Sequence, residues 1–214
     1  MRRAPVVLAL VCSLVAVATA APPLTRDQAL AALAKSDVEG RRQAAAWLGD
    51  LGVMTDTRVL VQALRDEDDV VRVLAERSLW RIWSRSGDHD IDVLFEQGVE
   101  DMQRGDAAAA ISVFTTIVEK KPDFAEGWNK RATVYYLVGE YQKSLHDCDE
   151  VVRRNPDHFG ALAGYGQIYL ALDDPERALE YFQRALRVNP NLVNVEAAVV
   201  ELKRRIIEKR KGVI

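Results

Sequence analysis

Cysteine and histidine are scarce in this sequence of 214 residues, which contains two cysteines and three histidines. Cys12 lies in an apolar N-terminal run, so Cys148 is the only thiol in the remainder of the chain. A single cysteine cannot close an internal disulfide, which excludes a small fold held together by disulfides. An isolated histidine is also a poor zinc site, so little supports a metal centre.

The short motifs of common enzyme classes are absent as well. The sequence has no Gly-x-Ser-x-Gly turn, no His-Glu-x-x-His helix and no phosphate-binding loop. The segment Gly164-Tyr165-Gly166 begins like a dinucleotide-binding fingerprint, but the helical pattern around it offers no preceding strand. We therefore expect no catalytic residues, no metal ion and no cofactor.

The first 20 residues have the pattern of a secretory signal peptide. Arg2 and Arg3 form a basic start, residues 6–17 are apolar, and Ala18-Thr19-Ala20 ends the segment with small residues. The apolar run is too short to span a bilayer comfortably. We expect cleavage after Ala20 and export, to the periplasm if the source is a bacterium. An uncleaved anchor is the alternative.

Positive charge is not in excess. The formal net charge is −3, and it becomes −5 when Arg2 and Arg3 leave with the signal peptide. Because binding to phosphates requires a basic surface, this balance argues against a nucleic acid partner.

Residues 91–192 contain one pattern three times. Pro122, Pro156 and Pro190 recur at an interval of about 34 residues, which is typical of helical repeat arrays. The register also holds for Gly98, Ala132 and Gly166, for Ala110, Ser144 and Ala178, for Phe114, Cys148 and Phe182, and for Ile117, Val151 and Ala185.

Each of these units reads as two helices joined by a turn, at residues 104–106, 138–140 and 172–174. A small residue on the first helix allows the second to pack closely, and the proline ends the second helix. Cys148 shares a column with two phenylalanines, so we expect it to be a small buried hydrophobe rather than a nucleophile.

The register resembles that of the tetratricopeptide repeat. The second unit matches best, because Trp128, Ala132, Tyr135 and Pro156 occupy the aromatic, small, tyrosine and proline positions of the motif. The first unit departs from it, with Leu94 in place of the tryptophan and Asp101 in place of the tyrosine. The resemblance implies an all-α, right-handed solenoid of helical hairpins that stack into one core. The third unit matches at Gly166, Tyr169, Ala178, Phe182, Ala185 and Pro190.

The resemblance also implies a concave groove lined by the first helix of each repeat. The side chains that it places there are mostly apolar with a few amides and hydroxyls, which suits an extended peptide or an amphipathic helix of another protein. Partial filling of the groove by the chain's own terminal helices is the alternative. The predicted groove residues are Phe95, Val99, Met102, Asn129, Thr133, Tyr136, Ala163, Gln167 and Leu170.

An acidic chain terminus does not suit this groove. Family members that bind the terminal carboxylate of cytosolic chaperones use lysine, arginine and asparagine side chains. The corresponding positions here are Phe95, Val99, Lys130, Gly160 and Gly164, of which only Lys130 is cationic.

Residues 25–85 contain a different repeat, with a period of about 31 residues. It resembles a pair of HEAT repeats, whose second helices carry an aspartate and an arginine four residues apart on one face. The capping-box spacing of Thr25 with Gln28 and of Ser36 with Glu39 predicts two helix starts. A shift of 31 residues aligns Leu33 with Leu64, Asp37 with Asp68, Arg41 with Arg72, Ala44 with Ala75, Leu48 with Leu79 and Leu51 with Ile82.

Trp47, Trp80 and Trp83 lie on these second helices, and we expect them to fill the seam between the two kinds of repeat. An exposed aromatic contact for a partner is the alternative. Residues 86–90 form a short linker, in which Asp88, His89, Asp90 and nearby Asp92 lack the alternating ligand pattern of a calcium loop. A turn with Asp90 capping the next helix explains them better.

Residues 193–214 are predicted to form a capping helix. Val195, Val199, Leu202 and Ile206 recur at helical spacing and can cover the last repeat. The opposite face and the tail are basic, which raises the alternative of a membrane-surface accessory protein attracted weakly to anionic lipids. The oligomeric state is left open. The basic residues are Lys203, Arg204, Arg205, Lys209, Arg210 and Lys211.

Overall fold

The computed structural model describes residues 24–35 and 37–212 of the chain. Within this part the backbone forms α helices, one short 3-10 helix and connecting turns, without a strand. The predicted all-α solenoid is therefore confirmed. The predicted signal peptide, residues 1–20, lies outside the described residues. None of the described helices combines the length and the apolarity needed to cross a bilayer.

The N-terminal block consists of two helical hairpins, as the shorter repeat predicted; its likeness to HEAT repeats stays a prediction. Its elements are α1 (Arg26–Lys35), α2 (Val38–Leu51), η1 (Met54–Asp56), α3 (Thr57–Ala63) and α4 (Asp69–Trp83). The C-terminal array consists of three further hairpins and one last helix: α5 (His89–Gln103), α6 (Ala107–Lys120), α7 (Ala125–Leu137), α8 (Tyr141–Arg154), α9 (Phe159–Ala171), α10 (Pro175–Val188) and α11 (Val193–Arg210).

The helix ends in the array fall where the sequence predicted them. The three turns lie at residues 104–106, 138–140 and 172–174, and each second helix ends two residues before a proline. Gly105 and Gly139 have φ angles of +76° and +79°, a conformation that glycine adopts without strain. Asp173 holds the equivalent position in the third repeat with φ at 55°.

The small residues of the first helices do allow close packing, but against a ring. A Cβ atom on Gly98 would lie 2.8 Å from the Phe114 ring, and Gly166 approaches Phe182 in the same way. Both phenylalanines are buried. The atoms nearest to each glycine belong to these rings and not to Ala110 or Ala178, so the phenylalanine column is the one that requires glycine.

Charged residues join the two hairpins of the N-terminal block. Asp37 and Asp68 cap α2 and α4, and their carboxylates accept hydrogen bonds from the backbone amides of the first turn. Arg42 reaches from α2 to Asp68 at 2.6 Å and holds the pKa of that carboxyl at about 2. Arg41 pairs in the same way with Asp66 at 2.8 Å. Asp66 and Asp68 of the second hairpin thus bind arginines of the first hairpin. Asp68 also caps its own helix.

One of the two predicted capping boxes forms, and the other falls partly outside the described residues. The reciprocal bonds between Thr25 and Gln28 form, with Thr25 N–H donating at 2.8 Å. Ser36 lies outside the described residues, and Asp37 is the cap of α2.

The prediction that Asp90 caps α5 is wrong. Asp88 has this role, because its carboxylate accepts from the amides of Asp90 and Ile91 at 3.0 and 3.4 Å. Asp90 already lies inside the helix, so its own side chain is past the cap position.

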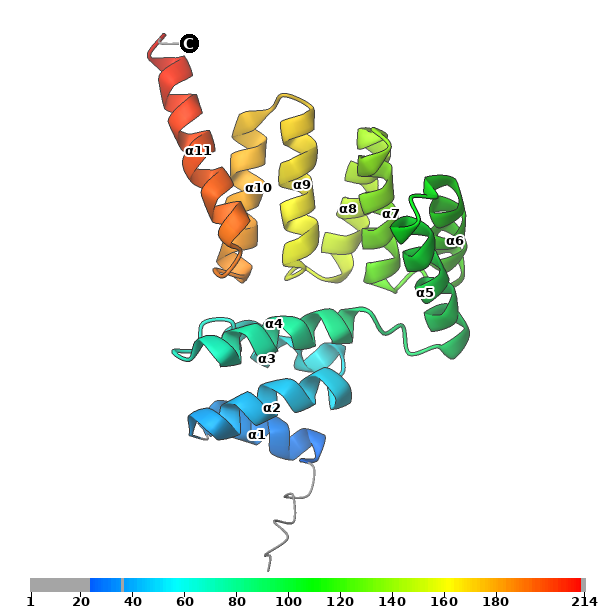
Figure 1. Ribbon diagram of the computed structural model, residues 1–214, viewed down its shortest axis with the longest axis vertical. Coiled ribbons are helices and arrows are strands. Elements are labelled where there is room, and N and C mark those ends of the chain that lie inside the picture. Colours follow the sequence, from blue (N-terminus) through cyan, green and yellow to red (C-terminus); the bar gives the residue numbers. More distant parts are fainter. Residues whose placement is uncertain (1–23, 36, 213–214) are drawn as a thin grey trace, which may run out of the picture.

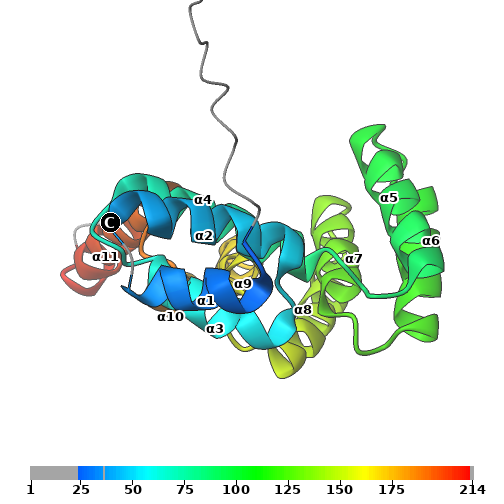
Figure 2. The same ribbon diagram turned by 90° about the horizontal axis from the view of Figure 1, so that it is seen from below.

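The N-terminal block does not extend the array from its first repeat. Figure 1 shows α4 running transversely beneath the ends of α9 and α10. From below, Figure 2 shows the block in front of α9, while α5 and α6 of the first repeat lie off to one side. Asn191, just after α10, donates to the Leu64 carbonyl at 2.8 Å, and Asn189 donates to Glu76 at 3.0 Å. The block therefore folds back against the later repeats.

Arg65 adds a contact at the end of α10. Its guanidinium group donates to the carbonyls of Arg187 and Val188, which carry partial negative charge at the helix C-terminus. The loop between α3 and α4 is thereby tied to the third repeat.

Trp80 and Trp83 fill the seam between the block and the array, as predicted. Trp83 is 3% exposed, stacks on His158 with ring centroids 4.5 Å apart, and contacts Phe159 at 5.0 Å. Trp80 meets the same two rings edge-on. For Trp47 the seam prediction is wrong, since the shallow hollow that it lines is formed by α2 and α4 alone. Trp47 is 36% exposed.

The last helix has the predicted capping role. Val199, Leu202 and Ile206 of α11 are buried, and the first two pack with Ala178 and Phe182 of α10. Figure 1 shows α11 at the outer edge of the array, with no described element beyond it.

Replacing Trp83 by alanine should lower the free energy of unfolding by about 3–5 kcal/mol, because the cavity left in the seam cannot collapse fully. Trp47→Ala is the matched control, and it should cost less, about 1–2 kcal/mol, since that indole is 36% exposed. Urea unfolding of both variants measures the difference, and similar losses would show that the seam does not carry the packing assigned to it.

Leu202→Ala should lower the free energy of unfolding by about 2–5 kcal/mol, because the side chain is 3% exposed between α11 and α10. Val200→Ala on the same helix should change it little in dilute solution. Thermal unfolding followed by circular dichroism tests both variants. An unchanged midpoint for Leu202→Ala would contradict the capping role of α11.

Candidate functional site

The concave side of the second and third repeats contains an open hollow of about 260 Å³. Its walls come from α7 and α9, and its floor comes from α8. The volume is below the range of about 300–1,000 Å³ typical of small-molecule sites, and it fits one large side chain. The lining residues are Asn129, Ala132, Thr133, Tyr136, Leu137, Ser144, Cys148, Gly160, Gly164, Gln167 and Ile168.

The missing side chain of Gly164 opens this hollow. Gly160 and Gly164 lie one turn apart on the wall formed by α9. A Cβ atom on Gly164 would meet only the Cys148 sulfur, at 3.9 Å, so the space beside this glycine is open. The sequence pattern places Gly164 inside a repeat helix. A glycine on a helix predicted to line the groove was the available signal for a cavity.

Four of the nine predicted groove residues line the hollow together: Asn129, Thr133, Tyr136 and Gln167. Tyr136 packs against Tyr141 with ring centroids 5.9 Å apart, which fixes one rim. Thr133 donates to the carbonyl of Asn129 at 2.9 Å. The rim therefore combines an aromatic face with an amide and a hydroxyl group.

The other five predicted residues lie apart from the hollow. Phe95 is buried between the rings of Phe114 and Phe124, so its side chain belongs to the core of the first repeat. The remaining four pack elsewhere: Val99 and Met102 lie partly buried against the same core, Leu170 packs toward α10 and α11, and Ala163 is partly buried on α9.

The N-terminal block closes one end of the hollow. Trp80 contacts Gly160, where an added Cβ atom would collide with the indole. Lys130 extends over the same indole, with its Nζ atom 5.9 Å from the ring centroid. The chain's own helices thus wall the groove at this end, while the hollow itself stays open.

A buried polar network supports that wall. His158 is fully buried, and its Nδ1 atom accepts a hydrogen bond from the Ala161 amide at 3.0 Å. Its Nε2 atom therefore carries the proton and donates to Glu126 at 2.8 Å. Asn129 also donates to Glu126, at 3.1 Å, and Lys130 lies 3.1 Å from the second carboxylate oxygen.

These contacts keep Glu126 ionised. Burial raises the pKa of its carboxyl group, but the contacts with His158 and Lys130 outweigh burial and hold that pKa below its usual value. The network ties α7 to the start of α9 directly above the tryptophans of the seam. It thereby fixes Asn129 at the rim of the hollow.

Cys148 forms part of the floor and is buried, as predicted. Burial raises the pKa of its thiol to about 12, so the sulfur stays protonated and poorly nucleophilic. Within the described residues, no three histidine, cysteine, aspartate or glutamate side chains are grouped closely enough to bind a metal ion.

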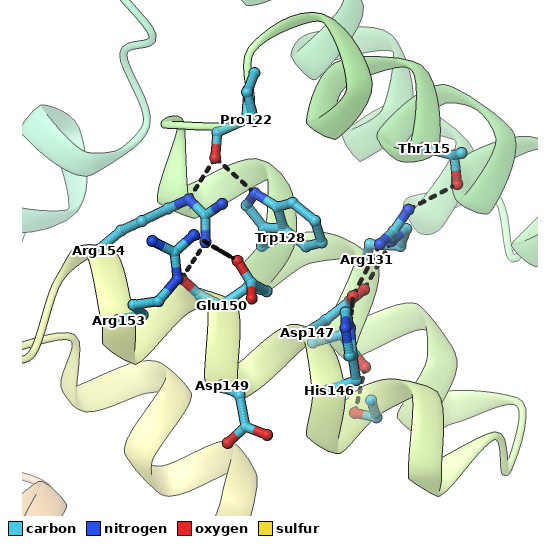
Figure 3. Close-up of polar contacts among 12 residues, drawn as sticks. Thr115, Pro122, Trp128, Arg131, His146, Asp147, Asp149, Glu150, Arg153 and Arg154 are labelled. Atoms are coloured by element: carbon cyan, nitrogen blue, oxygen red, sulfur yellow. Dashed lines mark hydrogen bonds and ion pairs between the residues drawn. The ribbon is translucent and has the colours of Figure 1, made fainter.

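The opposite side of α7 serves packing. Figure 3 shows Trp128 between the guanidinium groups of Arg131 and Arg154, whose carbons lie 5.0 and 4.7 Å from its ring centroid. Arg131 forms two hydrogen bonds to Asp147 and one to Thr115. These contacts join α6, α7 and α8, so this face of α7 is occupied and the hollow faces the other way.

The tetratricopeptide repeat family matches residues 95–147 and 123–191 of the chain. A tetratricopeptide repeat protein of Rhizobium etli is 32% identical over 126 residues, which cover 59% of this chain and 61% of that protein. Tetratricopeptide repeat protein 12 of Mus musculus is 32% identical over 101 residues, 47% of this chain and 14% of that protein. The chain thus spans less than two thirds of the length of these relatives.

Solved structures share the fold. MamA from Desulfovibrio magneticus superposes with a TM-score of 0.52 and 21% identity over 73% of this chain and 87% of that one. The Sgt2 tetratricopeptide domain from Aspergillus fumigatus gives a TM-score of 0.56 and 21% identity over 59% of this chain and 85% of that domain. The first tetratricopeptide domain of Spaghetti, bound to the HSP90 peptide SRMEEVD, gives a TM-score of 0.53 and 22% identity over 55% of this chain and 93% of that domain. The tetratricopeptide repeats predicted from the sequence register are confirmed.

Proposed function

We propose that the chain is a protein-interaction adaptor, which holds an extended segment of a partner protein by one large apolar side chain inserted between α7 and α9. The observation that carries this proposal is the open hollow beside Gly164, with Tyr136 and Asn129 on its rim. An apolar anchor in such a cavity provides affinity, and the amide and hydroxyl groups on the rim provide hydrogen bonds to a peptide backbone.

A solved structure of the same fold supports peptide binding by this architecture. The Spaghetti domain is bound to a peptide of HSP90. The acidic character of that peptide does not transfer to this chain. Lys130 is the only cation at the corresponding positions, and its charge is already engaged by the buried carboxylate of Glu126 at 3.1 Å. We therefore propose an apolar anchor rather than an acidic terminus.

The cellular setting is part of the proposal. The N-terminal 20 residues read as a signal peptide, so the partner would be another protein of the cell envelope. Attachment to membranes through the basic face of α11 gains no support from the contacts of that helix. Arg204 is bridged by Glu201 and Glu208, which offsets part of the positive charge.

Gly164→Phe should reduce peptide binding at least tenfold, because the new ring occupies the hollow. Burial of one large apolar side chain contributes about 1.5–3 kcal/mol, and about 1.4 kcal/mol corresponds to tenfold. Gly164→Ala is the matched control, since its methyl group fits beside Cys148. Peptides selected from a random displayed library against the wild-type chain serve as probes in fluorescence polarisation.

Circular dichroism must show equal helicity for both variants. Equal peptide affinity in Gly164→Phe would contradict the hollow as the anchor site. A photoreactive residue in place of exposed Gln167 then identifies the partner in intact cells, and its adducts should disappear in the Gly164→Phe background.

The exported chain should begin at Ala21. Replacing Ala20 by lysine should block cleavage, because signal peptidase requires a small residue at this position. Intact-mass measurement of the protein from the cell envelope compares wild type and Ala20→Lys. A wild-type chain that retains Met1 in the cytoplasm would contradict export, without bearing on the groove.

A further inference from the structure

One side of α11 exposes a stripe of large apolar side chains. Val193, Val200 and Ile207 are 72%, 65% and 51% exposed, and they follow one another at intervals of seven residues. Residues seven apart lie on nearly the same side of a helix. The buried residues of α11 that contact α10 lie on its other side, so the stripe faces away from the array, where Figure 1 shows no described element.

The stripe is symmetric about its central residue. Val193 lies seven residues before Val200 and Ile207 lies seven after it, about 10 Å in each direction along the helix. Two copies of α11 that cross antiparallel at Val200 would therefore place Val200 against Val200 and Val193 against Ile207. All three large apolar residues of each stripe would be covered in this arrangement.

The charges beside the stripe complement each other in the same arrangement. Glu196 precedes the centre by four residues, while Lys203 and Arg204 follow it by three and four. In an antiparallel pair Glu196 of one copy lies beside Lys203 of the other, on the same flank of the stripe. In a parallel pair glutamate would face glutamate and lysine would face lysine. Neither Glu196 nor Lys203 forms an ion pair within the part of the chain that the structure describes.

We propose that α11 is a self-association surface, through which a second copy of the chain binds antiparallel with its two-fold axis at Val200. The helix has 18 residues, so it is about 27 Å long, and a contact confined to one helix from each copy is at the low end of interface sizes. The dimer is therefore concentration-dependent rather than obligate.

Cysteine crosslinking of the full mature chain tests the register. Val200→Cys should form a disulfide-linked dimer under mild oxidation, because the symmetry axis brings the two sulfurs together. Val193→Cys and Ile207→Cys should stay monomeric alone, since each would lie about 20 Å from its own copy. A mixture of these two variants should form the heterodimer. The native thiol of Cys148 is buried, with its pKa raised to about 12, so it stays out of the reaction.

Two results of this experiment would overturn the proposal. A Val200→Cys chain that stays monomeric at the highest soluble concentration would show that another molecule, or none, covers the stripe. Self-crosslinking of Val193→Cys would show a parallel pair or random collisions. Retained helicity of each variant is checked first by circular dichroism, and all three positions are exposed, so folding is not at risk.

Charge exchange gives an independent test by sedimentation velocity. Glu196→Lys alone should weaken dimerisation about tenfold, because the introduced lysine would face Lys203 of the other copy and the dimer contains this contact twice. Lys203→Glu alone should do the same. An equimolar mixture of the two variants should restore the dimer, since both contacts are again between opposite charges. A mixture that remains monomeric, while the wild type dimerises, would contradict the antiparallel register.

Discussion

The stacking of Trp83 on His158 decides the shape of this molecule. The indole belongs to the N-terminal block and the imidazole to the third repeat, and both are almost completely buried. Because the imidazole also donates to Glu126 and accepts from Ala161, its ring cannot turn without loss of two buried hydrogen bonds. The seam therefore fixes the block, the second repeat and the third repeat relative to one another.

The site inherits its geometry from this seam. Glu126 and Asn129 are neighbours on α7, and the same carboxylate that binds His158 also orients the amide at the rim of the hollow. Trp80 closes the end of the cavity where it touches Gly160. A groove that depends on hairpin stacking alone would be able to widen by small rotations between repeats. Here the rotation between α7 and α9 is opposed at the seam end of the cavity, by the hydrogen bond between Glu126 and His158 and by the packing of Trp80 on Gly160.

Much of the fold could be predicted from the sequence, because each repeat obeys local rules: prolines end helices, and periodic apolar residues identify buried faces. The placement of α4 could not, since it depends on contacts between distant residues, such as Asn189 with Glu76. A periodic pattern also identifies which residues face the groove, but not how far a side chain sinks into the core. Phe95 turns inward because Phe114 and Phe124 provide an apolar environment. The cavity itself depends on the side chain that Gly164 of α9 lacks.

The transverse position of α4 also limits how the array can change in length. Solenoids commonly gain or lose whole hairpins, since each unit contacts only its neighbours. In this chain α4 acts as a splint across the second and third repeats, because its Trp80 contacts both Lys130 and His158, and its Glu76 binds Asn189 at the end of the third repeat. A hairpin inserted between these two repeats would separate Lys130 from His158, so Trp80 could no longer contact both residues. Duplication of a hairpin is therefore tolerated only outside the second and third repeats, and no hairpin can be added between them.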